Sequence, residues 1–98
     1  MPVYMIVEAK EVMDKKGYGE YIRRVPETIE KFGGEYLARG GQVAVFSGDW
    51  KPERIIIVKF DSMDKFNAWW NSPEYRAIAP LRERSAKTNA IVIEGSSR

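Results

Sequence analysis

Two short segments of this 98-residue chain are apolar at every successive position. Val3 to Val7 reads VYMIV, and Ile55 to Val58 reads IIIV. Side chains alternate between the two faces of a β-strand, so a strand without polar positions is one that is buried on both faces. We therefore predict a strand at Val3 to Val7 and another from Arg54 to Phe60, each covered on both sides.

The segments that follow these strands have the spacing of amphipathic helices. After Asp14, which can cap a helix start, apolar residues recur every three or four positions. Pro26 lies inside this stripe and should kink the helix without ending it, because the periodicity continues past it. Ser62 predicts the start of a second helix, and Ser72 followed by Pro73 predicts the start of a third.

The remaining strands are less clearly marked. Glu35 to Arg39 and Val43 to Ser47 flank a pair of glycines, which predicts a hairpin or one bent, extended strand. The sequence SGDWKPE at residues 47–53 is typical of a loop, and Ala90 to Ile93 is predicted to form the last strand. The order β, α, β, β, α, β predicts an α+β, ferredoxin-like domain with an antiparallel sheet and helices on one face. This domain is expected over residues 1–95, followed by a polar tail at 96–98.

The face of the sheet that the helices leave open is expected to need a cover. Leaving about five of its apolar side chains in water would forgo roughly 1.5 to 3 kcal/mol each. That loss rivals the whole stability of a small domain, roughly 5 to 15 kcal/mol. Closed two-fold pairing is the commonest assembly of soluble chains, so we predict a homodimer that packs sheet against sheet.

The composition excludes several kinds of chemistry. The chain has no cysteine and no histidine, which removes disulfides, thiolate catalysis and the usual ligands of haem and transition metals. No metal and no cofactor are therefore expected. A net charge of +2 is too small for general binding to a phosphate backbone, so nucleic acid is not an expected partner. The short apolar run at the N-terminus resembles neither a signal nor a membrane segment, which predicts a cytoplasmic protein without membrane contact.

Several motifs together resemble a known family. They are YMIVE near the start, RGG at 39–41, GDW at 48–50, the isoleucine strand that ends at Phe60, and SPEYRAIAPLR at 72–82. With these motifs the chain is similar to the DUF1330 proteins of the dimeric α/β-barrel superfamily. The resemblance implies a ferredoxin-like subunit whose sheet packs on that of its twin, and it implies no particular activity. The wider superfamily includes monooxygenases, lactone isomerases and haem-handling proteins, and the haem-dependent activities need a histidine that this chain lacks.

Arg39 and Trp50 are candidate ligand-binding residues in the middle of the chain. Arg39 precedes two glycines, so a fixed cation lies beside flexible backbone and could clamp a carboxylate or an enolate oxygen. The alternative is an edge arginine that pairs with Glu35 or Glu8. Trp50 belongs to no helical or strand stripe, and its apolar area is expected to cover either the partner subunit or a ligand.

Tyr18, Tyr75 and Arg82 are the other candidates. They are expected to converge between the helices and the sheet, where hydroxyl and guanidinium donors in apolar surroundings are typical of a small-molecule site. The alternative is a set of core side chains with polar tips at the surface. The sequence predicts a module that binds a small acidic or aromatic molecule, and it leaves two alternatives open: a cofactor-independent isomerase or monooxygenase-like enzyme, and a structural or assembly role.

Overall fold

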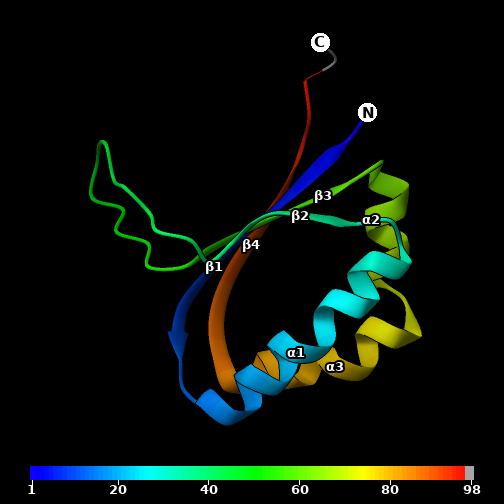
Figure 1. Ribbon diagram of the computed structural model, residues 1–98, viewed down its shortest axis with the longest axis horizontal. Helices are drawn as coiled ribbons and strands as arrows, with labels where there is room; N and C mark the ends of the chain where they lie inside the picture. The colour runs from blue at the N-terminus through cyan, green and yellow to red at the C-terminus, as the bar shows by residue number, and fades with distance from the viewer. Residues whose placement is uncertain (97–98) are drawn as a thin grey trace.

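The computed structural model describes residues 1–96, and within this range it contains a four-stranded antiparallel sheet and three helices. The elements are β1 (Val3–Val12), α1 (Lys15–Lys31), β2 (Glu35–Arg39), β3 (Ile55–Phe60), α2 (Met63–Trp70), α3 (Pro73–Ser85) and β4 (Ala86–Glu94). The strand order across the sheet is β2-β3-β1-β4, with every neighbouring pair antiparallel. This is the predicted ferredoxin-like α+β fold, and all three helices lie on one side of the sheet (Figure 1).

The helices begin at the predicted caps. The Asp14 carboxylate accepts a hydrogen bond from the Gly17 amide at 3.1 Å, and Ser62 and Ser72 accept from the amides three residues ahead of them at the same distance. Each cap satisfies one of the amides that the first turn of a helix leaves without an intrahelical partner. Helix α1 continues through Pro26 as predicted, and it ends at Lys31.

The two faces of the sheet differ sharply in exposure. On β1 the side chains of Val3 and Met5 are buried under the helices, and on β3 those of Val58 and Phe60 are fully buried. The outer face carries a row of isoleucines from three adjacent strands, since Ile6 pairs with both Ile57 and Ile91. Ile91 keeps 61% of its surface exposed, so this row lies open. Successive apolar residues on these strands thus alternate between a helix-covered face and a bare face.

The predicted hairpin at Gly40 and Gly41 is wrong. Residues 41–54 contain no strand, and the segment leaves the sheet as an extended loop that projects away from the domain (Figure 1). Strand β2 pairs instead with β3, so the chain between them makes a wide excursion. Val43 to Ser47 has the composition of a strand but no partner strand within residues 1–96, and Phe46 in its middle is 98% exposed. The composition correctly indicates an apolar segment at residues 43–47. A strand forms only where a neighbouring strand is available to pair with it, and composition does not predict this.

Two further features concern the chain as a whole. Within residues 1–96, none of the helices combines the length and the apolar character that crossing a bilayer requires. The polar tail predicted at residues 96–98 lies, after Ser96, outside the described residues.

Candidate functional site

A pocket lies between the inner face of the sheet and helices α1 and α3. Tyr18, Arg39, Tyr75 and Arg82 all line it, so four of the five candidate residues from the sequence come together. Its cavity volume is about 50 Å³. At about 10 to 15 Å³ for each water position, this leaves room for roughly three to five waters.

Trp50, the fifth candidate, lies elsewhere. It is 60% exposed, and its indole Nε1 donates a hydrogen bond to Oε2 of Glu8 at 3.1 Å. Together with Ile6, Ile55 and other residues of the outer face, it lines a groove on the side of the sheet that the helices do not cover. Trp50 is therefore separated from the pocket by the thickness of the sheet.

A β-bulge turns Arg39 towards the pocket. Tyr36 pairs with Val58, but the next paired residue on β2 is Ala38, opposite Ile57, so one residue between them is left out of the register. Side chains alternate along a strand, and an extra residue reverses the face to which all later side chains point. Arg39 consequently lies on the same face as Tyr36, and its guanidinium carbon is 4.7 Å from the centre of the Tyr36 ring.

Pro26 gives Arg39 a backbone acceptor. Proline has no amide hydrogen, so the carbonyl four residues earlier, that of Ile22, receives no hydrogen bond from position 26. Nη2 of Arg39 donates to this Ile22 oxygen at 3.4 Å. The proline that interrupts α1 therefore helps to hold the arginine at the edge of the pocket.

The Pro26→Ala variant tests this link. Alanine supplies an amide for the Ile22 carbonyl, and we expect the free energy of unfolding to rise by about 1 to 3 kcal/mol. Arg39→Ala should cost about 0.5 to 1.5 kcal/mol in the wild-type background and clearly less in the Pro26→Ala background, because the acceptor is then occupied. Urea unfolding of the four proteins measures both effects. Additive free energies would contradict the role of Pro26.

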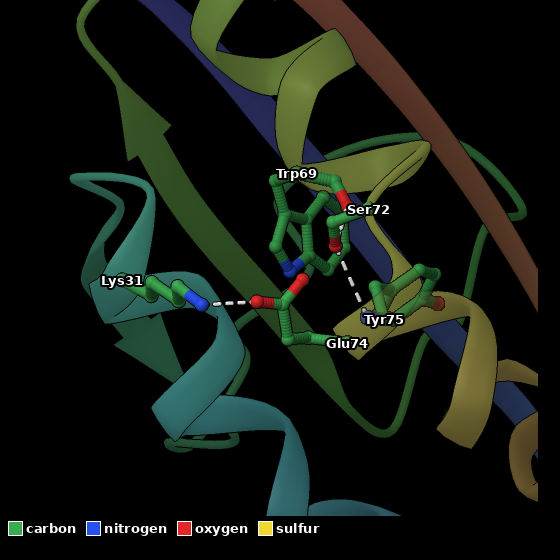
Figure 2. A network of polar contacts seen from close by, with 5 residues as sticks. All are labelled: Lys31, Trp69, Ser72, Glu74 and Tyr75. Carbon is green, nitrogen blue, oxygen red and sulfur yellow. Dashed lines mark hydrogen bonds and ion pairs between the residues drawn. The ribbon is translucent and has the colours of Figure 1, made fainter.

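Tyr75 is held from several sides at the base of the pocket. Its amide is capped by the Ser72 hydroxyl, and its ring centre lies 4.2 Å from that of Trp69 (Figure 2). Near this cap, Lys31 of α1 forms an ion pair with Glu74 of α3, which joins the two helices (Figure 2). The hydrogen bond lowers the pKa of the exposed Glu74 carboxyl.

A pair of phenols lies inside the pocket. The hydroxyl oxygens of Tyr21 and Tyr75 are 3.0 Å apart, and both side chains are buried. Burial, followed by the proximity of Tyr75, raises the pKa of Tyr21 far above its usual value. Burial also raises the pKa of Tyr18, although the neighbouring guanidiniums of Arg54 and Arg82 oppose this shift. Tyr18 and Tyr21 are therefore neutral at neutral pH.

The raised pKa of Tyr21 predicts a loss of stability at high pH. The folded-state pKa lies above the unfolded value of about 10, so the contribution of Tyr21 is complete below pH 10 and is lost as the pH rises further. Above pH 10 the free energy of unfolding of the wild type should fall more steeply than that of Tyr21→Phe, by about 1.4 kcal/mol per pH unit. Denaturant unfolding between pH 8 and 11.5 measures the two slopes, and parallel curves would refute the assignment.

Arg54 is a pocket residue that was not predicted from the sequence. This residue lines the pocket from the start of β3, on the same face as Ile56 and Val58. Counting back by two from these buried positions would have placed Arg54 under the helices. This could not be read from the sequence, because residues 55–58 are all apolar and do not show which of them face the helices and which face the open side of the sheet.

Comparison with known proteins agrees with this architecture. A protein of unknown function from Rhodopseudomonas palustris, RPA0582, superimposes with a TM-score of 0.79 over 99% of this chain and 84% of its own, at 17% identity. A dimeric ferredoxin-like protein of unknown function from Jannaschia sp. CCS1 gives 0.74 over 97% and 100%, at 12% identity. SnoaB, a cofactor-independent oxygenase from Streptomyces nogalater, gives 0.69 over 99% and 95%, at 9% identity.

Because all three identities are low, these structural likenesses establish the fold alone and not a function. No curated protein sequence matches the chain. The model of a domain of unknown function, DUF1330, matches residues 2–96, which is nearly the whole length and includes every motif named above. The chain belongs to the DUF1330 family.

Proposed function

We propose that this protein binds a small acidic organic molecule in the pocket between its sheet and its helices. The observation that carries the proposal is the charge of the pocket. Its lining includes the arginines Arg39, Arg54 and Arg82 and contains neither aspartate nor glutamate. Cations gathered in a partly apolar pocket whose lining has no carboxylate favour an anionic occupant, because a bound carboxylate would supply counter-charge inside the pocket.

The apolar lining supports an organic ligand. Val7, Ile22 and Trp70 contribute to the walls, and the phenols of Tyr21 and Tyr75 supply hydroxyl groups. A few polar groups in apolar surroundings are the general pattern of small-molecule sites, which combine burial with oriented hydrogen bonds. An inorganic anion has no apolar surface to bury against these side chains, so the apolar lining would add little to its binding free energy.

A thermal-shift screen with aromatic and 2-oxo acids tests the proposal. A ligand at a hundred times its Kd adds roughly 2.7 kcal/mol to the free energy of unfolding, which raises the Tm of a domain of this size by on the order of 10 °C. The Ile22→Trp variant narrows the pocket and should lose this shift, whereas Ala77→Trp, at an exposed position on α3, should keep it. If no acid stabilises the wild type, the proposal falls and an assembly role stands.

We also propose that two copies pair through the bare face of the sheet. The isoleucine row of Ile6, Ile57 and Ile91 is continued by Ile93 and Leu37, which are both about half exposed. In a two-fold dimer the same surface of each copy packs against that of the other, so the apolar face of both copies is buried in one interface. The protein from Jannaschia is described as dimeric, which supports the same assembly here.

A cofactor-independent enzyme is the second candidate function. Phenols beside guanidiniums suit enolisation, in which water or hydroxide from solvent takes the proton from the carbon next to a ketone, while the neutral phenols and the guanidiniums donate hydrogen bonds to the enolate oxygen. The likeness to the cofactor-independent oxygenase SnoaB supports this alternative. Exchange of the methyl protons of pyruvate for solvent deuterium, followed by NMR without any cofactor, would reveal it. Exchange no faster than in buffer, or equal exchange in Tyr18→Phe, would argue against it.

A further inference from the structure

Two arginines in the pocket each have a buried nitrogen without a hydrogen-bond partner. Within residues 1–96, Nε of Arg54 and Nε of Arg82 are the buried side-chain nitrogen or oxygen atoms that have no partner. A buried donor that is left unpaired loses its hydration without compensation, so native proteins satisfy nearly all such groups. Both arginines also line the pocket, so an occupant that accepts hydrogen bonds would satisfy these donors.

The other contacts of Arg82 leave this nitrogen free. Its Nη1 donates to Oγ1 of Thr88 at 3.3 Å, and its Nη2 lies 3.7 Å from a carboxylate oxygen of Glu83, whose side chain is 59% exposed. Only 17% of the Arg82 side chain is exposed, and its guanidinium carbon lies 5.7 Å from the centre of the Trp70 ring. These contacts fix the plane of the guanidinium and leave its Nε unpaired.

Arg54 is placed by a glycine at the start of the long loop. Gly40 has a φ of +77°, and a β-carbon added to it would lie 2.7 Å from Nη1 of Arg54. A side chain at position 40 would therefore displace the guanidinium as well as strain the backbone. On the pocket side, Arg54 is close enough to Tyr18 to oppose the burial shift in the pKa of that phenol. Arg54 is thus held between Gly40 and Tyr18.

Arg39 differs from these two arginines. It is exposed, its Nη2 donates to the Ile22 carbonyl, and its guanidinium lies over the Tyr36 ring. Its main contacts are already made by the protein itself, so it has less to gain from a ligand. Arg39, a candidate from the sequence, is therefore not one of the arginines with a buried, unpaired nitrogen.

We infer that Arg54 and Arg82 form the seat for the carboxylate of a compact monocarboxylic acid, with Arg39 contributing only long-range charge at the pocket edge. This inference rests on the proposed function and specifies its ligand. Arginine presents Nε and one Nη in a fork that matches the two oxygens of a carboxylate. A cavity volume of about 50 Å³ is well below the 300 to 1,000 Å³ typical of drug-sized ligands, which favours a 2-oxo acid or a single-ring aromatic acid.

Paired probes separate charge from shape. Calorimetric titration with pyruvate and benzoate, and with their neutral amides pyruvamide and benzamide, compares ligands of nearly equal size. We expect at least one of the acids to bind the wild type more than tenfold more tightly than its amide. Equal Kd values for acid and amide would overturn the carboxylate seat, while the proposed function would stand provided that the acid binds the wild type and no longer binds Ile22→Trp.

Three matched variants then locate the seat. Arg54→Gln and Arg82→Gln should each raise the Kd of the bound acid by about tenfold to a hundredfold, and Arg39→Gln by less than threefold. Arg54→Lys keeps the charge without the fork and should bind with an intermediate Kd. An effect of Arg39→Gln as large as that of the other two would overturn the assignment. Failure of every acid in the broader thermal-shift screen would instead reject the proposed function itself.

The stability of the unliganded variants gives an independent readout. Because the Nε atoms are unpaired without a ligand, Arg54→Met should unfold at the same Tm as the wild type or a higher one, while its acid binding is lost. A purely structural arginine would show the opposite, namely a lower Tm. A lower Tm of unliganded Arg54→Met together with unchanged acid binding therefore contradicts a binding role.

Discussion

Ile91→Glu is expected to convert the proposed homodimer into a monomer of 11.3 kDa. Ile91 pairs with Ile6 in the centre of the bare sheet face, and in a two-fold dimer each carboxylate would be buried against apolar side chains of the partner. Taking an unpaired charge out of water costs several kcal/mol, so we expect the dissociation constant to rise by on the order of a hundredfold or more. Sedimentation velocity at micromolar concentration measures the change.

The monomer itself should tolerate this substitution, because Ile91 is 61% exposed in the single chain. Arg24→Glu, on the exposed side of α1, is the control that adds an acidic side chain away from the sheet. It should remain dimeric. A wild-type protein that sediments as a monomer would reject the pairing, and an Ile91→Glu protein that stays dimeric would place the interface elsewhere.

Trp69→Ala is expected to cause the largest loss of stability. Trp69 is 1% exposed, and its ring lies within 6.0 Å of the ring centres of Phe60, Phe66, Trp70 and Tyr75. Its Nε1 also donates to Oγ1 of Thr28 at 3.0 Å, which links α2 to α1. Removing a buried large aromatic side chain costs about 3 to 5 kcal/mol, a large part of the roughly 5 to 15 kcal/mol that holds a small domain together.

Trp70→Ala is the matched control for this prediction. Trp70 is the next residue on the same helix, but it is only partly buried and packs against the guanidiniums of Arg76 and Arg82 at the side of the core. We expect its loss to cost less than half as much as that of Trp69. Chemical denaturation monitored by far-ultraviolet circular dichroism compares the two, and equal losses would contradict the distinction between core and edge.

These two tryptophans illustrate what periodicity does and does not predict. Neighbours on a helix point about 100° apart, so the sequence requires that the two be unequal. Which of them enters the core depends on the angle at which α2 meets the sheet, and this is a property of the packed structure. Trp69 is the buried residue and contacts Phe60 of β3, whereas Trp70 is only partly buried.

The strands show a similar division. The positions of β1 and β3 were predicted correctly from the sequence. The predicted end of β1 was Val7, whereas the strand continues to Val12. The predicted start of β4 was Ala90, whereas the strand begins at Ala86. The added residues are mostly polar and form strands because they pair with one another, as Glu8 does with Asn89. Pairing between distant segments overrides weak local preference.

The candidate site was only partly accessible from the sequence. Tyr75 and Arg82 share a helix face through their spacing, and this could be predicted from the 3.6-residue period. Arg39 faces the same pocket only because of the bulge on β2. The residues at positions 36–38 have no pattern that predicts a bulge. Trp50 belongs to the opposite side of the sheet because the long loop turns there, and loop direction is set by contacts such as the hydrogen bond to Glu8.

The sequence by itself determined the order of the elements, the helix caps at Asp14, Ser62 and Ser72, and the presence of more apolar strand surface than three helices cover. These properties follow from local steric preference, local hydrogen bonding and side-chain periodicity, which act over a few residues. Only the tertiary structure decided which arginines meet in the pocket and which of their nitrogens lack a partner. Those facts depend on strand register and on contacts between residues as far apart as Gly40 and Arg54, which no local pattern encodes.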